Sequence, residues 1–281
     1  MAGDSEALDL ALLSINQVTL REQWSLAEAI EGYARHGVHG IAVWRDKLAE
    51  LGLAEGARML RQHQMTVTGL CIGGLLTPAD SSLVQARLDD NRRAIEEAAE
   101  IGARCIVFVA GGLEDGDKDI AGARARCLEG LEALLPEARA AGVTLALEPL
   151  HPMMCAARSV LVTLAEANDW CDALGDGPEL GIAIDVYHLW WDPNLASEIT
   201  RAGKRIVAFH VNDWLADTQD LRLDRGMMGD GVIDIPTIRA MVEATGYDGH
   251  REVEIFSARD WWRRDPDEVV EVIKQRYQNA V

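Results

Sequence analysis

The sequence is poor in basic residues. It has 27 Lys and Arg against 46 Asp and Glu, a formal net charge of −19 at pH 7. A surface of this sign repels nucleic-acid backbones and anionic membranes. No apolar run approaches the ~20 residues of a membrane-spanning helix, and the first residues, MAGDSEALDLALLSINQ, lack the basic segment and apolar core of a signal peptide. We therefore expect a cytoplasmic protein that binds neither nucleic acid nor membranes.

The sequence also lacks the glycine-rich motifs that bind phosphate groups and the cysteine pairs that bind metals. Neither GxGxxG nor a P-loop (GxxxxGKS or GxxxxGKT) occurs, which argues against dinucleotide and P-loop sites. The cysteines are odd in number and widely spaced, without a CxxC pair, so we expect reduced packing residues rather than disulfides or a sulfur metal site. They are Cys71, Cys105, Cys127, Cys155 and Cys171.

Short apolar runs rich in β-branched residues alternate with longer stretches of helical periodicity along the whole chain. We expect eight strands, near residues 10–15, 40–44, 66–72, 105–110, 143–147, 180–184, 206–209 and 252–256. No linker and no shift in composition divides them. The pattern predicts an α/β fold, a single (β/α)8 TIM barrel over residues 1–281 with its active site at the C-terminal ends of the strands. An open doubly wound sheet usually has fewer strands and a glycine-rich phosphate turn.

Four successive predicted strands end in polar residues. Glu148 follows VTLAL, Asp185 follows LGIAI, His210 follows RIVAF, and Glu254 lies near the end of EVEIFS. The carboxyl ends of barrel strands share one rim, so these side chains should converge. Any one acid could instead cap a helix, but three crowded carboxylates require a cation. With one imidazole they suit a divalent ion such as Mn²⁺, Mg²⁺, Co²⁺ or Zn²⁺.

The segments ALEPLHP, AIDVYH, FHVND, GDGVIDIP and VEIF resemble the xylose isomerase-like TIM-barrel superfamily, in its branch of sugar phosphate isomerases and epimerases. That branch includes ketose 3-epimerases, hydroxypyruvate isomerases and inosose dehydratases. The resemblance implies that Glu148, Asp185, His210 and Glu254 ligate one divalent ion, most often Mn²⁺. It also implies that Glu148 and Glu254 are catalytic and exchange protons with carbon on opposite faces of a sugar. Family members are often homodimers or homotetramers.

The resemblance also implies contacts to the substrate. His188, in the D-x-x-H pattern, would hydrogen-bond a substrate oxygen, and either Arg222 or Arg225 would do so from the loop after the seventh strand. The chain departs from the ketose 3-epimerases at one position. Those enzymes carry a glutamate six residues after the first metal ligand, and this chain has Met154 there.

Aromatic residues and one histidine extend the candidate substrate site. Indole faces often cover the C–H side of a bound sugar. The tryptophans that follow predicted strand ends are Trp44, Trp190, Trp191, Trp214 and Trp261. Of these, Trp44 and Trp214 are our candidates for contacting the sugar; the alternative is that the rings cover loops or form a subunit contact. His151 is either a general acid or an ordinary loop histidine.

The predicted site supports proton transfer at a carbon beside a carbonyl. A divalent ion stabilises the enediolate, one carboxylate removes the proton and a second returns it. The chemistry is that of an isomerase or epimerase acting on a sugar or a polyol-derived ketone. If the enediolate expels a β-hydroxyl, the same site becomes a lyase of the inosose-dehydratase kind.

Two further classes fit the sequence less well. An abasic-site endonuclease of the same superfamily would require several zinc ions and more histidines at the strand ends. A non-catalytic sugar-binding subunit would bind its ligand without exchanging C–H protons. A phosphorylated substrate would require more basic groups around the mouth, so we expect an unphosphorylated or lightly modified sugar.

Overall fold

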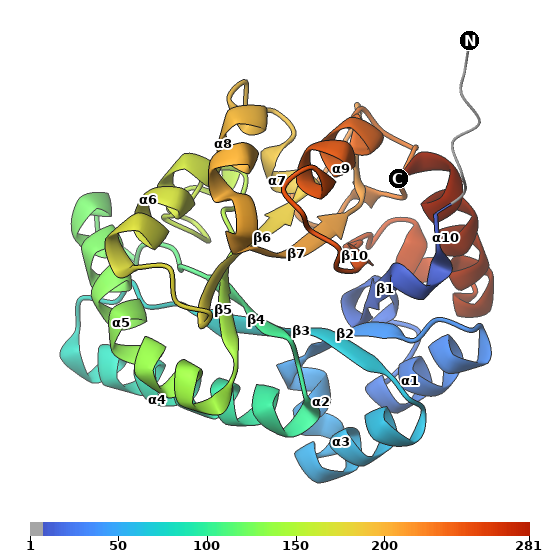
Figure 1. The fold of residues 1–281 in the computed structure, drawn as a ribbon, viewed down its shortest axis with the longest axis horizontal. Coiled ribbons are helices and arrows are strands. Elements are labelled where there is room, and N and C mark those ends of the chain that lie inside the picture. The colour runs from blue at the N-terminus through green and yellow to red at the C-terminus, as the bar shows by residue number, and fades with distance from the viewer. Residues whose placement is uncertain (1–7) are drawn as a thin grey trace.

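A computed structural model of the chain describes residues 8–281, and within them eight parallel strands close into a barrel (Figure 1). The barrel order is β1-β10-β7-β6-β5-β4-β3-β2, so the last barrel strand pairs with the first. The barrel strands are β1 (Leu13–Asn16), β2 (Gly40–Trp44), β3 (Thr66–Gly74), β4 (Cys105–Val109), β5 (Thr144–Leu147), β6 (Leu180–Asp185), β7 (Ile206–Val211) and β10 (Arg251–Val253). The predicted TIM barrel is confirmed.

Helices surround the barrel, as Figure 1 shows. They are α1 (Leu26–Arg35), α2 (Arg45–Leu51), α3 (Leu53–Gln62), α4 (Ser81–Ile101), α5 (Ile120–Ala141), α6 (Leu164–Leu174), α7 (Val186–Leu189), α8 (Leu195–Ala202), α9 (Ile235–Glu243) and α10 (Pro266–Ala280). Local chemistry sets many of the ends. The side chain of Ser25 forms a capping box with Glu28 at the start of α1, and Gly102 ends α4 in the left-handed conformation.

The strands are apolar because the barrel buries both of their faces. All five residues of β4, CIVFV, are buried. One face packs against the helices, and small inward-facing side chains fill the barrel. A separate buried cluster draws one small residue from each of four neighbouring strands, and it consists of Cys105, Ala146, Ala183 and Ala208. The described cysteines are all free, as expected, and only Cys155 is not fully buried.

The first and last strands differ from their predicted ranges. Residues 10–12 form a 3-10 helix rather than the start of β1, because the Asp9 carboxylate accepts the Ala11 N–H and turns the backbone. The predicted strand start at residue 10 is therefore wrong by one turn. The last barrel strand ends at Val253, and Glu254 follows it while still donating its N–H to the Val211 carbonyl, 3.2 Å away.

Strand β2 lies very close to β1. A Cβ added at Gly40 would stand 2.5 Å from the Leu13 carbonyl oxygen and 2.8 Å from Ser14 Cα. Only glycine allows this approach, which lets β1 pair on both sides, with β2 and with β10. The position therefore helps to close the barrel.

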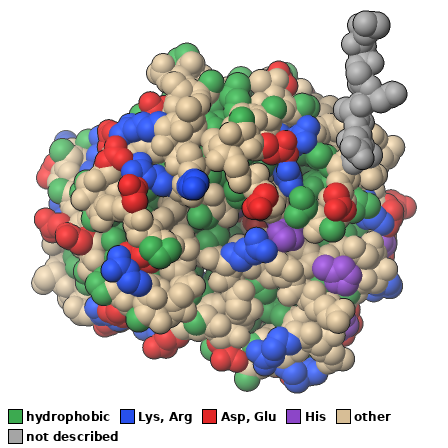
Figure 2. All heavy atoms as spheres, viewed as in Figure 1, with side chains coloured by type: hydrophobic (Ala, Val, Ile, Leu, Met, Phe, Trp, Pro, Cys, Tyr) green, Lys and Arg blue, Asp and Glu red, His purple; other side chains and the backbone are tan. Residues whose placement is uncertain are grey.

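The surface carries both acidic and basic side chains and is not predominantly basic, in agreement with the acidic composition. On the face shown in Figure 2, acidic and basic side chains are interspersed. Many arginines are held in ion pairs, such as Arg45 with Asp90 and Glu97. None of the helices between residues 8 and 281 combines the length and the apolar character that a membrane crossing requires.

Candidate metal and substrate site

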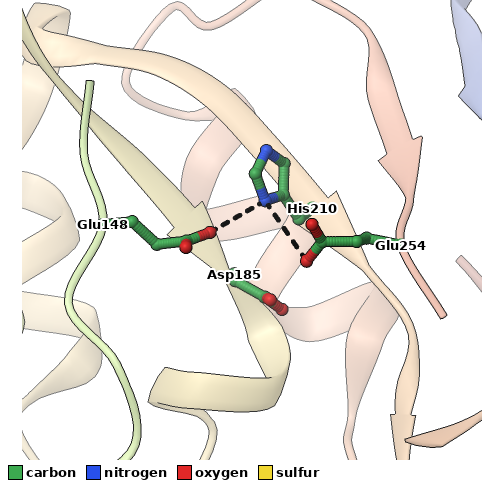
Figure 3. A group of neighbouring side chains, drawn as sticks. All are labelled: Glu148, Asp185, His210 and Glu254. Carbon is green, nitrogen blue, oxygen red and sulfur yellow. Dashed lines mark hydrogen bonds and ion pairs between the residues drawn. The ribbon is translucent and has the colours of Figure 1, made fainter. Parts of the chain in front are cut away.

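The four residues predicted to bind a metal meet at the carboxyl ends of the strands (Figure 3). Glu148 follows β5, Asp185 ends β6, His210 lies in β7 and Glu254 follows β10. All are buried, and one ligand atom from each lies within 4.8 Å of the others. His210 Nδ1 is 3.1 Å from a Glu148 oxygen and 4.0 Å from a Glu254 oxygen. Strand register produces this arrangement, because Asp185 pairs directly with His210 across β6 and β7.

A buried arginine joins two of these carboxylates. Arg225 Nη1 donates to Asp185 Oδ2 at 2.9 Å and to Glu254 Oε2 at 3.0 Å. Its guanidinium lies between the rings of Tyr187 and Phe256, with Cζ 4.4 and 4.8 Å from their centres. Burial would raise the pKa of Asp185, but the charge of Arg225, the two neighbouring histidines and the Tyr187 N–H together lower it. Burial raises the pKa of Glu254 to about 8 in spite of Arg225.

The donor set fits a divalent cation. Three carboxylates and one imidazole nitrogen converge from four separate strands, and hard divalent ions prefer oxygen donors with few nitrogens. Compensation for the crowded acids is visible at the same place, since Arg225 bridges two of them and burial raises the pKa of Glu254. Both features reflect the cost of bringing buried carboxylates together, which a divalent ion would offset.

A fourth acid, Glu252, supports the cluster from inside the barrel, and the sequence analysis missed it. Its carboxylate accepts from Asn16 Nδ2 at 2.9 Å and from Thr68 Oγ1 at 2.6 Å, and it lies 3.6 Å from His210 Nε2. Asn16 also donates to Glu254, at 3.0 Å. Burial would lower the pKa of His210, but the charges of Glu252, Glu148 and Glu254 together raise it well above its ordinary value. The alternation in REVEIF, which turns residues 252 and 254 to the same side, was the available signal.

The FHVND segment holds the site from outside the cluster. Asn212 donates to Asp185 Oδ1 at 3.0 Å, which leaves Oδ2 for the cluster. The Asp213 carboxylate accepts four backbone N–H groups, at 2.8 to 3.0 Å, from Trp214 and from the loop at residues 229–233. The GDG turn thus wraps a carboxylate of the protein and shapes the mouth.

The cavity beside the cluster brings together part of the predicted substrate site. Its charged and polar lining is Glu148, Glu254, His188, Arg222, Arg225 and Arg158. Trp44 lines it as well, with its indole N–H fixed on Asn16 Oδ1 at 2.8 Å. Met154 also lines it, so an apolar side chain stands in the cavity at this position. Arg158 was not expected from the sequence, because it lies in a loop without a recognisable motif.

Two predicted residues lie behind the cavity wall. Neither His151 nor Trp214 is among the described residues that line the cavity. Their rings stack on each other with centres 4.8 Å apart, and the backbone N–H of His151 donates to His188 Nδ1 at 3.1 Å. The His151 backbone therefore orients the His188 ring. Burial lowers the pKa of His188 to about 3, so its ring is neutral at physiological pH.

The other tryptophans near strand ends have structural contacts. Trp191 donates its indole N–H to the His188 carbonyl at 2.7 Å. Trp190 packs beside Trp214, with ring centres 5.8 Å apart, and Trp261 is buried against the Arg264 guanidinium. These rings support the loops that carry the site.

Comparison with known proteins identifies relatives of the whole chain. A family model described as xylose isomerase-like TIM barrel matches residues 30–276. No curated protein matches the sequence significantly. Among solved structures, protein SMc04130 from Sinorhizobium meliloti is 52% identical, with a TM-score of 0.94 over 97% of this chain and 99% of that chain.

More distant structures share the fold. An IolI protein with a bound zinc atom is 20% identical, with a TM-score of 0.83 over 94% of this chain and 95% of that chain. A D-psicose 3-epimerase, determined in the presence of D-fructose, is 19% identical, with a TM-score of 0.75 over 95% of this chain and 96% of that chain.

Proposed function

The chain belongs to the xylose isomerase-like TIM barrels, and we propose that it is a metal-dependent isomerase or epimerase. Its substrate would be a sugar or a polyol-derived ketone, and its reaction the transfer of a proton at the carbon beside a carbonyl. The observation that carries the proposal is the convergence of Glu148, Asp185, His210 and Glu254 within 4.8 Å in a buried cluster beside a cavity.

The four residues would hold one divalent ion, which we propose to be Mn²⁺. When bound, the ion would stabilise negative charge on the substrate oxygens next to the reacting carbon. The zinc atom bound by the IolI protein supports a divalent ion and makes Zn²⁺ the first alternative to test. His210 would bind through Nδ1, because Nε2 faces Glu252.

Glu148 and Glu254 would move the proton. Strands β6 and β7 lie between β5 and β10 in the barrel, so the two carboxylates reach the cavity from different sides. One would accept a proton from carbon and the other would return one, which inverts a centre or shifts the carbonyl. The neutral imidazole of His188 and the guanidinium of Arg225 line the same cavity and would bind substrate oxygens.

Solvent exchange tests the proposal directly. Chelator-treated protein is reloaded with Mn²⁺ and incubated in D₂O with a panel of ketoses and keto-inositols, and deuterium at carbon is followed by NMR. We expect exchange only in the loaded protein, and its loss in Glu254→Gln. Glu132→Gln, an exposed position on α5, is the matched control and should exchange normally. Absence of exchange across the whole panel contradicts the proposal.

A second candidate is a lyase of the inosose-dehydratase kind on the same residues. Met154 favours it. The ketose 3-epimerases carry a glutamate at this position, whereas here an apolar side chain lines the cavity. The same incubation separates the two, since a lyase product has the ultraviolet absorbance of a conjugated enone and an epimer does not.

A further inference from the structure

Two arginines that line the cavity have no counter-ion. Among the described residues, neither the Arg158 nor the Arg222 side chain takes part in a hydrogen bond or ion pair, and both line the cavity that contains Glu148 and Glu254. Arg225, the third arginine there, is committed to Asp185 and Glu254. Arg158 is half-buried and Arg222 is exposed at the mouth. In a chain with net charge −19 acids are plentiful, so two arginines that line one cavity without an acidic partner in the described part of the chain point to an anionic ligand.

The Arg158 loop is held in place by backbone contacts. The Val160 N–H donates to the Gly111 carbonyl at 2.8 Å, and the Leu113 N–H donates to the Ala156 carbonyl at 2.7 Å. A Cβ at Gly112 would collide with the backbone of residues 156–157, so the two loops meet only because that residue is glycine. The loop that presents Arg158 is therefore preorganised, which reduces the entropy lost on binding.

The Arg222 loop is anchored in a similar way. The Asp220 carboxylate accepts the backbone N–H groups of Arg222 and Leu223, at 2.8 and 2.9 Å, which fixes the turn before the guanidinium. Three residues later, the Arg225 N–H donates to the Phe256 carbonyl at 2.9 Å. The turn is thus fixed locally by Asp220, and the end at Arg225 is tied to the barrel mouth.

The positive groups destabilise one another. Burial lowers the pKa of Arg158, and the charges of Arg222 and Arg225 lower it further. With a divalent ion bound, the ion and Arg225 would balance the three carboxylates that face it. Glu252, the remaining acid, is held by Asn16 and Thr68 and does not line the cavity. Arg158 and Arg222 would thus still lack an ion-pair partner there among residues 8–281.

We propose that Arg158 and Arg222 form a subsite for an anionic group of the substrate, a carboxylate or a phosphate. Guanidinium groups match both anions by parallel N–H donors, and two of them supply charge and orientation together. For catalysis, the inference rests on the proposed function. The substrate of that reaction is then a sugar acid or a sugar phosphate rather than a neutral sugar. The sequence predicted an unphosphorylated sugar because a phosphate would require more basic groups around the mouth. Arg158 is such a group.

Binding to the Mn²⁺-loaded full chain tests the subsite without requiring catalysis. The calorimetric probes are D-fructose, its phosphate ester D-fructose 6-phosphate, and the keto acid 5-keto-D-gluconate. We expect at least one anionic probe to bind about 10-fold or more tightly than D-fructose, and Arg158→Gln or Arg222→Gln to weaken that binding about 10- to 100-fold. Arg87→Gln, on the exposed face of α4, is the matched control and should change none of these affinities.

The arms of the experiment identify the anion. If only the binding of 5-keto-D-gluconate depends on the two arginines, the subsite takes a carboxylate. If only the binding of D-fructose 6-phosphate depends on them, it takes a phosphate. Binding of the anionic probe should weaken between about 50 and about 500 mM NaCl, because salt screens the attraction. Equal affinity for neutral and anionic probes, or anionic binding that survives both substitutions, overturns the subsite.

The subsite and the proposed function fail in different ways. Arginine-dependent binding of an anion, without deuterium exchange in any probe, sustains the subsite and contradicts the isomerase. Exchange in D-fructose that is unaffected by Arg158→Gln, with no preference for anionic probes, sustains the isomerase and overturns the subsite. Neither substitution removes a side-chain hydrogen bond or ion pair among the described residues, so both variants should unfold thermally near the wild type.

Discussion

Replacing Glu252 by Gln should weaken metal binding while leaving the fold intact. The substitution keeps the shape of the side chain and removes its charge. The carboxylate lies 3.6 Å from His210 Nε2, while Nδ1 of the same ring faces the cluster. A carboxylate in this place holds the ring in the tautomer whose Nδ1 is free to bind an ion and makes that nitrogen a better donor.

The size of the effect follows from that distance. At 3.6 Å and an effective dielectric constant of about 20, two unit charges interact by about 4 to 5 kcal/mol. A metal-bound imidazole gains only part of a unit charge, so we expect a loss of about 1.4 to 2.7 kcal/mol. This corresponds to a 10- to 100-fold rise in the dissociation constant, about the usual effect of losing such a partner.

The metal-free protein should respond differently. The variant loses one negative charge from a crowded acidic interior, which is favourable, but it also loses the charge that stabilises a protonated His210 ring. The amide can accept only one of the hydrogen bonds that Asn16 and Thr68 now donate to the two carboxylate oxygens, which costs about 1 kcal/mol. The melting temperature without metal should therefore change by only a few degrees, whereas a simple packing defect would lower it without a specific loss of affinity.

Calorimetric titration of Mn²⁺ into chelator-treated protein measures the affinity, and thermal unfolding without metal measures the fold. The control is Glu132→Gln, which removes the same charge from the exposed face of α5. If Glu252→Gln binds Mn²⁺ as tightly as this control, the supporting role of Glu252 is refuted.

Three other outcomes are expected. Burial raises the pKa of Glu254 from 4.5 to about 8, so protonation of this carboxyl stabilises the folded chain without metal. That contribution to stability is fully present below about pH 4.5 and is lost as pH rises toward 8, while Mn²⁺ affinity rises over the same interval. Melting curves with and without metal measure both, and flat profiles contradict the assignment. Asp213→Ala leaves the N–H groups of the loop at residues 229–233 without their acceptor and should lower stability by about 3 kcal/mol, several degrees in melting temperature; a change below one degree contradicts the anchoring role. Gly40→Ala forces β2 away from the backbone of β1 and should destabilise the barrel by about 3 kcal/mol; an unchanged denaturation midpoint contradicts the close packing.

The barrel and the four clustered residues could be predicted because both depend on local sequence. Alternating apolar and helical stretches predict the strands, and a parallel barrel brings every strand's carboxyl end to one rim. Glu148, Asp185, His210 and Glu254 each stand at such an end, so their convergence follows from the fold whatever the loops do. The first strand was placed three residues too early because Leu10–Leu12 is apolar, and apolar character alone does not distinguish a 3-10 turn from a strand.

The sequence by itself thus determined the architecture and which residues meet at its rim, since a short-range pattern encodes both. Only the tertiary structure decided that Arg225 joins the acids, that Glu252 stands behind His210, and that Arg158 and Arg222 face the cavity without partners. These relations join positions far apart along the chain. They depend on the path of irregular loops and on which charged side chains come into contact. No periodic pattern in the sequence predicts either.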